Sequence, residues 1–253
     1  MLLVIDIGNT DIVGGLYRAG GLVSSFRLRS QARRTEDEYS AGFLAHLAER
    51  GVAATEIEQV VISSVVPALT PTIRQLCLRL FGREALVLGP DFWPRLPLEL
   101  PSPREIGSDL VANALAAHRR FARDCLVVDF GTALTFTALR GGGKVLGVTI
   151  APGLCTAIES LTRHTAQLPE VELVPPASVI GTDTVMSIQA GVLHGYAGLV
   201  EHLCAAISKE MGGRVHVVAT GGLCKVIAPL VSCFDLIDQG LTLDGLAFAA
   251  EYA

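Results

Sequence analysis

Two stretches of the sequence share one order of apolar and polar residues. Aliphatic residues lead to an acid, a glycine and a small polar side chain at residues 4–10, and again at residues 127–132. Such runs predict buried strands that end in tight turns. The two acids, Asp6 and Asp129, stand close to half of the 253-residue chain apart. A glycine lets backbone N–H groups approach phosphate oxygens, and a carboxylate can organise a metal ion. The repeat therefore predicts two similar halves around one nucleotide.

The same pattern continues after each copy. Strand-like runs flank a short glycine-rich segment, which is typical of a β-hairpin. The runs are residues 11–18 and 22–29 around Ala19-Gly20-Gly21, and residues 133–140 and 144–151 around Gly141-Gly142-Gly143. The duplication therefore covers a strand, a hairpin and a third strand in each half.

The rest of the chain alternates predicted strands and helices. A capping box at Thr35 and Glu38 begins a helix that extends to about Arg50, and prolines between residues 91 and 103 exclude regular structure there. Other helices are predicted at 69–82, 105–123, 153–164, 183–210 and 243–251, and other strands at 59–66, 84–89, 214–219 and 234–238. This order predicts an α/β fold of mixed sheets with helices on their faces. We place the domain boundary near residue 120, which gives halves 1–120 and 121–253.

Composition favours a compact globular protein. Half of the residues are hydrophobic, 18% are charged and the mean hydropathy is +0.48, which is unlike a disordered chain. The net charge of −5 and the lack of a basic block argue against nucleic-acid binding. No stretch approaches the roughly 20 apolar residues of a membrane span, and the first apolar run has no basic segment before it. We therefore expect a cytoplasmic protein with no membrane and no nucleic-acid partner.

Cysteines and histidines do not form a metal-binding pattern. The six cysteines are scattered without a C-x-x-C pair, and the six histidines lack the spacing of zinc ligands. Most cysteines stand in apolar surroundings, so we expect buried thiols without disulfides.

Short motifs rich in glycine, threonine and proline recur along the chain in a fixed order. They are Asp6-Ile7-Gly8-Asn9-Thr10, Ser64-Val65-Val66-Pro67, Gly107-Ser108-Asp109, Asp129-Phe130-Gly131-Thr132, Ile150-Ala151-Pro152-Gly153-Leu154, Thr165-Ala166-Gln167-Leu168-Pro169, Ile180-Gly181 with Thr184, Thr220-Gly221-Gly222, and Leu241-Thr242-Leu243-Asp244-Gly245-Leu246. In these motifs the chain resembles the type III pantothenate kinases over essentially its whole length. Its duplicated unit is similar to that of the actin and hexokinase superfamily. The resemblance therefore implies duplicated ribonuclease-H-like domains, also called actin-like ATPase domains.

An activity follows from the resemblance and not from composition. It implies ATP-dependent phosphorylation of pantothenate at its terminal hydroxyl, which is the first step of coenzyme A biosynthesis. It also implies Mg²⁺ with ATP, a monovalent cation (K⁺ or NH₄⁺) and a homodimer.

The resemblance implies that eight consecutive residues form the first phosphate loop and bind ATP. They are Asp6, Ile7, Gly8, Asn9, Thr10, Asp11, Ile12 and Val13. Asp6 is then placed to organise Mg²⁺ through water, and Thr132 is a further ATP contact. The alternative is that Asn9 and Thr10 only form the turn of a hairpin.

The resemblance also implies residues that act on pantothenate and the monovalent cation. Asp109 matches the general base, which takes the proton from the attacking hydroxyl, and Asp129 matches the ligand of the monovalent cation. The substrate-binding positions are Leu100, Gly107, Ser108, Asp109, Leu110 and Thr184. Structural interpretations remain open, since Asp109 suits the first turn of a helix, Asp129 suits a strand end and Thr184 suits a helix N-cap.

Four positions depart from the family's pattern. Leu110 stands where the family has arginine, and Leu100 stands where it has an aromatic residue. Leu134 and Thr137 stand where it has threonine and aspartate. A guanidinium would offer several donors to pantothenate, and losing one charge-assisted hydrogen bond costs about 1.5–3 kcal/mol. The departures therefore predict weakened pantothenate turnover.

Three functions compete on these grounds. The first is a type III pantothenate kinase with a rearranged pocket, in which Arg104 or Arg163 replaces the missing guanidinium. The second is a paralogue that binds nucleotide or protein partners without turnover. The third is a kinase for a more apolar hydroxylated substrate, which Leu100 and Leu110 favour.

Overall fold

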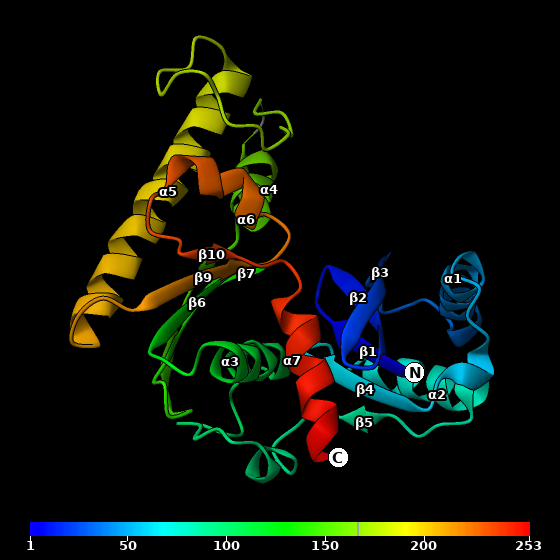
Figure 1. Ribbon diagram of the computed structural model, residues 1–253. Helices are drawn as coiled ribbons and strands as arrows, with labels where there is room; N and C mark the ends of the chain where they lie inside the picture. The colour runs from blue at the N-terminus through cyan, green and yellow to red at the C-terminus, as the bar shows by residue number, and fades with distance from the viewer. Residues whose placement is uncertain (166) are drawn as a thin grey trace. The chain divides into compact units, whose positions relative to one another are not determined.

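The computed structural model describes residues 1–165 and 167–253 (Figure 1). Ala166, which belongs to one of the motifs above, lies outside the described residues. The chain divides into two units, and each is built on its own five-stranded sheet. The first unit comprises Met1–Ala116 and Leu241–Ala253, and the second comprises Ala117–Gly240.

The first sheet has the strand order β3-β2-β1-β4-β5. Its central strand β1 (Leu2–Ile7) pairs antiparallel with β2 (Asp11–Arg18), which forms a hairpin with β3 (Gly21–Arg29). On its other side β1 pairs parallel with β4 (Gln59–Ser64), and β4 pairs parallel with the short strand β5 (Leu86–Val87).

The second sheet repeats this arrangement, with the order β10-β9-β6-β7-β8. Here β6 (Cys125–Phe130) takes the place of β1, and β7 (Ala133–Leu139) and β8 (Val145–Pro152) form the antiparallel hairpin. The parallel strands are β9 (His216–Thr220) and β10 (Leu236–Ile237). The predicted duplication is therefore confirmed, and it also includes the two parallel strands of each sheet.

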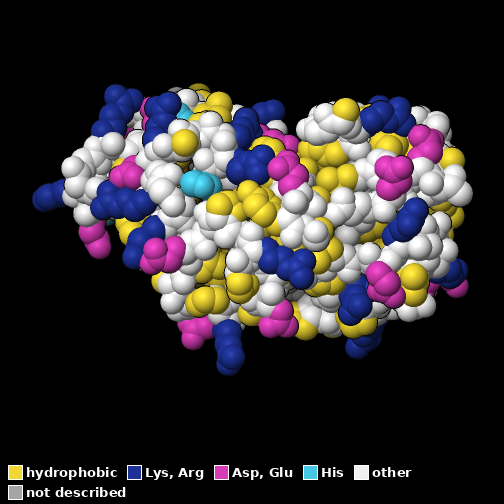
Figure 2. Space-filling view, turned by 60° about the horizontal axis from the view of Figure 1, so that its bottom comes forward, with side chains coloured by type: hydrophobic (Ala, Val, Ile, Leu, Met, Phe, Trp, Pro, Cys, Tyr) yellow, Lys and Arg dark blue, Asp and Glu magenta, His cyan; other side chains and the backbone are white. Residues whose placement is uncertain are grey.

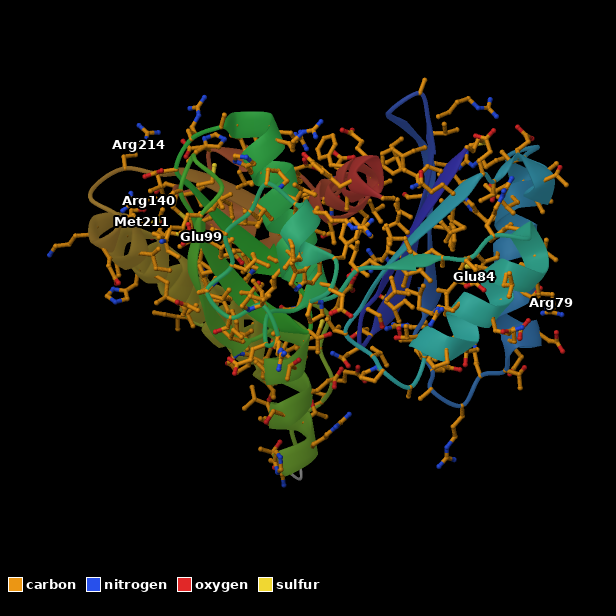
Figure 3. The ribbon with its side chains drawn as sticks, turned by 90° about the horizontal axis from the view of Figure 1, so that it is seen from below. Arg79, Glu84, Glu99, Arg140, Met211 and Arg214 are labelled. Atoms are coloured by element: carbon orange, nitrogen blue, oxygen red, sulfur yellow. The ribbon has the colours of Figure 1, made fainter. Side chains whose placement is uncertain are left out.

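Helices cover both faces of the first sheet. α1 (Glu36–Glu49) begins with the predicted capping box, in which Thr35 and Glu38 bond each other's backbone N–H groups. It packs with α2 (Thr70–Phe81) over one apolar face, and Arg79 of α2 forms ion pairs with the acidic first turn of α1 (Figure 3). The opposite face packs against α3 (Ser108–Phe121) and the C-terminal helix.

The C-terminal segment differs from the expected half 121–253, because it returns to the first unit as α7 (Leu241–Ala249). Gly245 explains the close packing, since a Cβ atom there would lie 1.9 Å from the carbonyl oxygen of Ala112 in α3. Thr242 Oγ1 donates to Asn113 Oδ1 at 2.8 Å, and the hydroxyl of Tyr17 on β2 donates to the Asp244 carboxylate at 2.6 Å. The final motif of the sequence therefore joins α7 to α3 and to the first sheet.

Three helices cover the other sheet on one face. They are α4 (Leu154–His164), α5 (Thr184–Glu210) and α6 (Cys224–Ile227). Arg140, directly after β7, donates to the carbonyl oxygen of Met211 at the end of α5 at 2.8 Å (Figure 3). The short 3₁₀ helices of the chain are Ala54–Glu56, Trp93–Arg95, Ala228–Leu230 and Ala250–Tyr252.

Helix α5 differs from the sequence expectation, because its length and composition are those of a membrane span. One such helix is weak evidence of a membrane, since core helices of soluble proteins have the same composition. Leu193, Val200 and Cys204 of α5 are buried in the core of the second unit. On the face of the molecule in Figure 2, acidic and basic side chains are interspersed with apolar ones.

Candidate active site

The turn between β1 and β2 is held by hydrogen bonds from its own backbone and from Ser30. The N–H of Gly8 donates to the carbonyl oxygen of Asp11 at 2.9 Å. Ser30 donates through Oγ to the Gly8 oxygen at 2.5 Å and through its N–H to the Thr10 oxygen at 2.9 Å. Asn9 and Thr10 are exposed at the tip. The turn is thus a fixed, solvent-facing backbone of the kind that approaches phosphate oxygens. Ser30 was not identified from the sequence, because it is far from the motif in the chain.

The remaining residues of the predicted ATP loop have different surroundings. Ile7 and Ile12 are fully buried in the apolar core against α1 and α2. Asp11 forms ion pairs with Arg27 at 2.8 Å and Arg29 at 3.6 Å across the hairpin. Ile7 and Ile12 can therefore offer a nucleotide only their backbone groups, whereas the side chains at the tip of the turn are accessible.

Asp6 lies near the carboxyl end of β1, directly opposite Ser63 on the parallel strand β4 and Val13 on β2. The Ser63 hydroxyl is hydrogen-bonded to that of Ser108 at 2.9 Å, and the N–H of Ser64 donates to Ser108 Oγ at 3.0 Å. These bonds hold the first turn of α3 at the carboxyl end of β4, beside the end of β1 that carries Asp6. The predicted substrate residue Ser108 is thus an anchor of α3, and the sequence alone did not show its partners on β4.

Asp109 follows this anchor in the first turn of α3. Its Oδ1 accepts a hydrogen bond from the N–H of Leu110 at 2.8 Å. Burial raises the pKa of Asp109 above the ordinary value, and the backbone hydrogen bonds oppose this shift in part. A Cβ atom on Gly107 would lie 2.4 Å from Asp109 Oδ1, so only glycine leaves room for this carboxylate position. A partly buried carboxylate with a raised pKa is suited to accept a proton.

The second unit carries an acid at the corresponding place. Asp129 on β6 lies directly opposite Thr135 on β7 and Thr220 on β9, so the three side chains share one face of the sheet. Among the described residues, the buried hydroxyls of Thr135 and Thr220 have no hydrogen-bond partner. Gly221 has a φ of +88°, and a Cβ atom there would lie 2.6 Å from Asp129 Oδ1. Thr135 and Thr220 were missed as site residues, because only the register of the strands places them beside Asp129.

The turn after β6 is also held in place. The carbonyl oxygen of Thr132 accepts hydrogen bonds from the N–H of Gly153 at 3.0 Å and from Thr156 Oγ1 at 2.8 Å. The N–H of Gly131 donates to the Ala133 oxygen at 3.1 Å. A Cβ atom on Gly153 would lie 2.4 Å from the Thr132 oxygen, so α4 begins against this turn.

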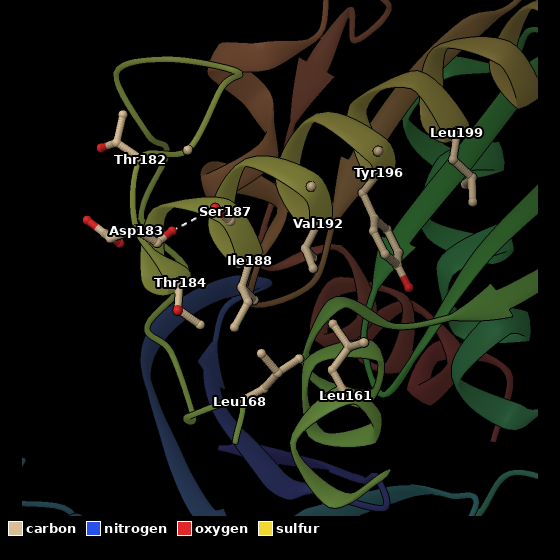
Figure 4. Close-up of a pocket in the computed structure, with 13 residues that line it drawn as sticks. Leu161, Leu168, Thr182, Asp183, Thr184, Ser187, Ile188, Val192, Tyr196 and Leu199 are labelled. Carbon is tan, nitrogen blue, oxygen red and sulfur yellow. Dashed lines mark hydrogen bonds between the residues drawn. The ribbon is translucent and has the colours of Figure 1, made fainter. Parts of the chain in front are cut away.

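Thr184 lies elsewhere in the second unit, at the start of α5 (Figure 4). The N-cap of this helix is Asp183, whose carboxylate accepts from the N–H of Met186 at 2.8 Å and whose carbonyl oxygen accepts from Ser187 Oγ at 2.6 Å. The alternative reading of Thr184 as the N-cap is therefore wrong by one residue.

Thr184 also borders a hollow of about 830 Å³ between α4 and α5. Its walls are largely apolar, with Leu161 on one side and Ile188 and Tyr196 on the other (Figure 4). The hollow combines an apolar surface with the hydroxyl of Thr184, which suits a ligand with both apolar and polar parts.

Residues 2–206 match the family model described as Type III pantothenate kinase. A type III pantothenate kinase of Moorella thermoacetica is 42% identical over 252 residues, which cover 99% of each chain. One of Treponema pallidum is 46% identical over 256 residues, which cover 99% of this chain and 93% of the relative. This chain belongs to the type III pantothenate kinase family.

Solved structures of more distant proteins show the same fold. The activator of the 2-hydroxyisocaproyl-CoA dehydratase from Clostridium difficile, solved with bound ADPNP, matches with a TM-score of 0.58 and 15% identity over 100% of this chain and 93% of that one. Component A of the (R)-2-hydroxyglutaryl-CoA dehydratase from Acidaminococcus fermentans matches with a TM-score of 0.56 and 14% identity over 100% and 96%. Together with the duplicated sheets, these likenesses confirm the expected actin-like ATPase fold.

Leu110 and Leu100, two of the departures noted in the sequence, both belong to the first unit. Leu110 follows Asp109 in α3 and is only 9% exposed. Leu100 packs against the core formed by Phe92, Trp93 and Leu96, and Trp93 Nε1 donates to the Pro103 oxygen at 2.9 Å. Both leucines therefore present apolar surface, and neither side chain can form a hydrogen bond.

The other two departures lie on opposite faces of the second sheet. Leu134 is opposite Phe130 and fully buried in the core against the helices, so it points away from the face of Asp129. Thr137 is opposite Val127 and shares the face of Asp129. A threonine at position 134 would therefore add no side-chain oxygen to the face that carries Asp129.

Proposed function

We propose that this chain is an active pantothenate kinase, which transfers the γ-phosphoryl group of ATP to the terminal hydroxyl of pantothenate and forms phosphopantothenate. Membership in the type III pantothenate kinase family over nearly the whole chain supports this proposal. The observation that carries it is the position of Asp109. Its neighbour Ser108 is hydrogen-bonded to the end of β4, next to Asp6 on β1, and Gly107 leaves space for the Asp109 carboxylate.

Asp109 acts as the general base in this proposal. Phosphoryl transfer has a loose transition state, so the enzyme mainly positions the attacking and leaving oxygens and neutralises charge. The Asp109 carboxylate takes the proton from the pantothenate hydroxyl as the oxygen attacks phosphorus. Because burial raises the pKa of Asp109, its carboxylate is a stronger base than an exposed aspartate.

Mg²⁺ with ATP fits the edge of the first sheet. Asp6 supplies a carboxylate beside an exposed turn whose backbone is held by Ser30. Mg²⁺ retains several waters, so Asp6 would hold the ion through water. The ion would neutralise charge on the phosphates. The N–H groups and side chains at the tip of the turn, Asn9 and Thr10, would orient the phosphate chain.

A monovalent cation, K⁺ or NH₄⁺, fits the face of Asp129 in the second sheet. The Asp129 carboxylate would hold the cation, with hydroxyl oxygens of Thr135 and Thr220 on either side in register. A buried hydroxyl without a partner is costly, and an oxygen lone pair directed at a cation removes that cost. Thr132, on the turn that follows, would contact ATP.

Pantothenate would be held by a mixture of apolar and polar groups. Leu100 and Leu110 offer apolar surface in the first unit, and Thr184 offers a hydroxyl in the second. Of the two arginines that were considered as replacements for the family's guanidinium, Arg104 precedes α3 and is exposed. Arg163 instead forms an ion pair with Glu159 at 3.4 Å in the second unit. We therefore assign the positive charge of the substrate pocket to Arg104.

The proposal includes a homodimer in the cytoplasm. Large apolar side chains are exposed near the start of α5, with Val179, Ile180 and Val185 among them, and Ile180 is 78% exposed. A second copy of the chain would cover this surface. The cysteines of the described residues form no disulfide, as is usual in a reducing compartment. Light scattering of the purified protein would give twice the chain mass, and Ile180→Asp would lower it.

The test of the function is pantothenate-dependent release of ADP from ATP, Mg²⁺ and K⁺ by the purified protein. The proposal predicts release with pantothenate and none with small apolar alcohols. Release with the alcohols alone would support a kinase for an apolar substrate. Binding of a non-hydrolysable ATP analogue without ADP release would support the paralogue that lacks turnover.

A further inference from the structure

Two cysteine side chains face each other in the second unit. Cys204 lies on α5 and is 1% exposed, whereas Cys233 lies in the segment between the 3₁₀ helix Ala228–Leu230 and β10 and is half-buried. Each of these thiols lies close enough to the other to shift its pKa. Both side chains belong to the apolar core between the sheet and its helices. The two thiols are therefore neighbours in this core although 28 residues separate them in the chain.

A second contact holds the two segments in this alignment. Glu201 lies one turn before Cys204 on α5, so the two side chains share a face of the helix. The Glu201 carboxylate accepts hydrogen bonds from the N–H of Ser232 at 3.0 Å and from its hydroxyl at 3.2 Å. Ser232 and Cys233 are thus docked side by side on Glu201 and Cys204, and the contact of the thiols does not depend on one flexible side chain.

We propose that Cys204 and Cys233 form a site of reversible thiol oxidation, at which a peroxide converts the two thiols into a disulfide. This inference goes beyond the kinase function and does not rest on it. Redox-sensitive cysteines are accessible and stand next to a resolving thiol. The half-buried Cys233 is the thiol that a peroxide can reach, and the buried Cys204 is the resolving thiol.

The reaction balances in two steps. The Cys233 thiolate attacks one oxygen of hydrogen peroxide, the O–O bond breaks, and the departing hydroxide takes a proton to become water. The sulfenic acid on Cys233 is then attacked by the sulfur of Cys204, which forms the S–S bond and releases a second water. The peroxide gains the two electrons that the thiols lose. A small thiol such as dithiothreitol reverses the reaction by thiol–disulfide exchange.

The electrostatic surroundings fit these roles. The neighbouring Cys204 thiol lowers the pKa of Cys233, whereas the neighbouring Cys233 together with burial raises the pKa of Cys204. Because the thiolate is the nucleophile, Cys233 reacts first. Burial raises the pKa of Cys77 to about 12 and that of Cys125 to about 11, so these thiols are protonated near neutral pH.

A disulfide at this site would fasten the segment before β10 to α5. That segment leads directly into β10, which pairs with β9, the strand that ends at Thr220. The oxidised protein is therefore expected to exchange the amide hydrogens of residues 231–237 more slowly than the reduced protein, because opening this segment would require α5 to move with it.

The test treats the native full-length protein with hydrogen peroxide, alkylates the remaining thiols and maps the peptides by mass spectrometry. We expect the peptides of Cys204 and Cys233 to be joined, at a mass lower by two hydrogen atoms, and to separate after dithiothreitol. Cys155→Ser is the matched control, because Cys155 is exposed on α4 and should not affect the link. The proposal would be overturned if Cys204 were recovered as an alkylated thiol while Cys233 had become a sulfinic acid. It would also be overturned if Cys204 and Cys233 were both alkylated, and therefore unreacted, in protein whose Cys155 had been oxidised.

A single-cysteine variant tests the order of the steps. In Cys204→Ala, the sulfenic acid of Cys233 should persist and be trapped by dimedone, whereas in the parent protein the disulfide should leave little to trap. Equal trapping in both proteins would contradict the role of Cys204. The peptide map of the parent protein needs no substitution, so it remains decisive if Cys204→Ala does not fold. Neither readout measures kinase activity, so the failure of this proposal leaves the kinase proposal untouched.

Discussion

Gly107 leaves the space that the carboxylate of Asp109 occupies, since a Cβ atom on Gly107 would lie 2.4 Å from Asp109 Oδ1. The second unit repeats this relationship, because a Cβ atom on Gly221 would lie 2.6 Å from Asp129 Oδ1. In both units, a glycine of one of the motifs thus leaves space for an aspartate carboxylate in addition to forming a turn. These two glycines connect the duplicated fold to the chemistry that we propose.

Gly107→Ala should displace the Asp109 carboxylate with little effect on the fold. Misplacing a catalytic group by about 1 Å can cost roughly a hundredfold in rate, so we expect kcat to fall by about that factor. Steady-state kinetics and a thermal melt check this result. Gly89→Ala is the matched control, because a Cβ atom there meets nothing within 4 Å. Parental kcat in Gly107→Ala would contradict the positioning role.

The pH dependence should report the raised pKa of Asp109. The base must be ionised, so kcat/KM should rise with pH through a pKa above the ordinary aspartate value of about 3.9. The folded protein also holds this proton more tightly than the unfolded chain, so Asp109 lowers stability as pH rises through that ordinary value and beyond it. In Asp109→Asn, urea unfolding at several pH values should show a smaller loss. An unchanged pH dependence of stability would contradict the raised pKa.

Gly221→Ala should weaken the response to monovalent cations. It combines a strained φ of +88° with a clash against Asp129, and we expect a loss of stability of about 1 kcal/mol or more. The K⁺ concentration for half-maximal activity should rise as well. Gly222→Ala is the control, because its Cβ atom meets nothing within 4 Å. Titration of activity with K⁺ separates the two variants, and identical K⁺ curves would argue against Asp129 as the ligand.

Leu134→Thr and Thr135→Val should have opposite effects, because the two residues lie on opposite faces of β7. Leu134→Thr buries a hydroxyl in the core and should cost about 1–3 kcal/mol in unfolding free energy, with an unchanged response to K⁺. Thr135→Val removes a buried hydroxyl without a partner among the described residues, so stability should hold while activation by K⁺ weakens. Urea unfolding and K⁺ titration measure both effects. A K⁺ response that changes only in Leu134→Thr would reverse this assignment of faces.

Much of the fold was predictable, because apolar runs and glycine-rich turns determine local structure. The hairpins after Asp6 and Asp129 and the capping box at Thr35 follow from such local patterns. The predicted strand at 84–89 is shorter, since only Leu86–Val87 pairs with β4. The return of α7 to the first unit was not predictable, because it depends on contacts of Gly245 and Thr242 with α3, far away in the chain.

The candidate site was predictable where one motif contains all its members. Gly107, Ser108 and Asp109 are consecutive, and the structure gives each a defined position. The anchor of Ser108 on Ser63 and the placement of Thr220 beside Asp129 depend on strand register, which no single motif contains. For the same reason the sequence grouped Leu134 with Thr137, although the register places them on opposite faces of the sheet.

The most direct test is mass-spectrometric detection of phosphopantothenate after incubation of the purified protein with ATP, Mg²⁺, K⁺ and pantothenate. The parent protein should form the product, and Asp109→Asn should form it about 10²–10⁴-fold more slowly while it still binds an ATP analogue, because a general base contributes that factor. Absence of product from folded, nucleotide-binding parent protein would contradict the proposed activity. Equal rates in the two proteins would contradict the role of Asp109.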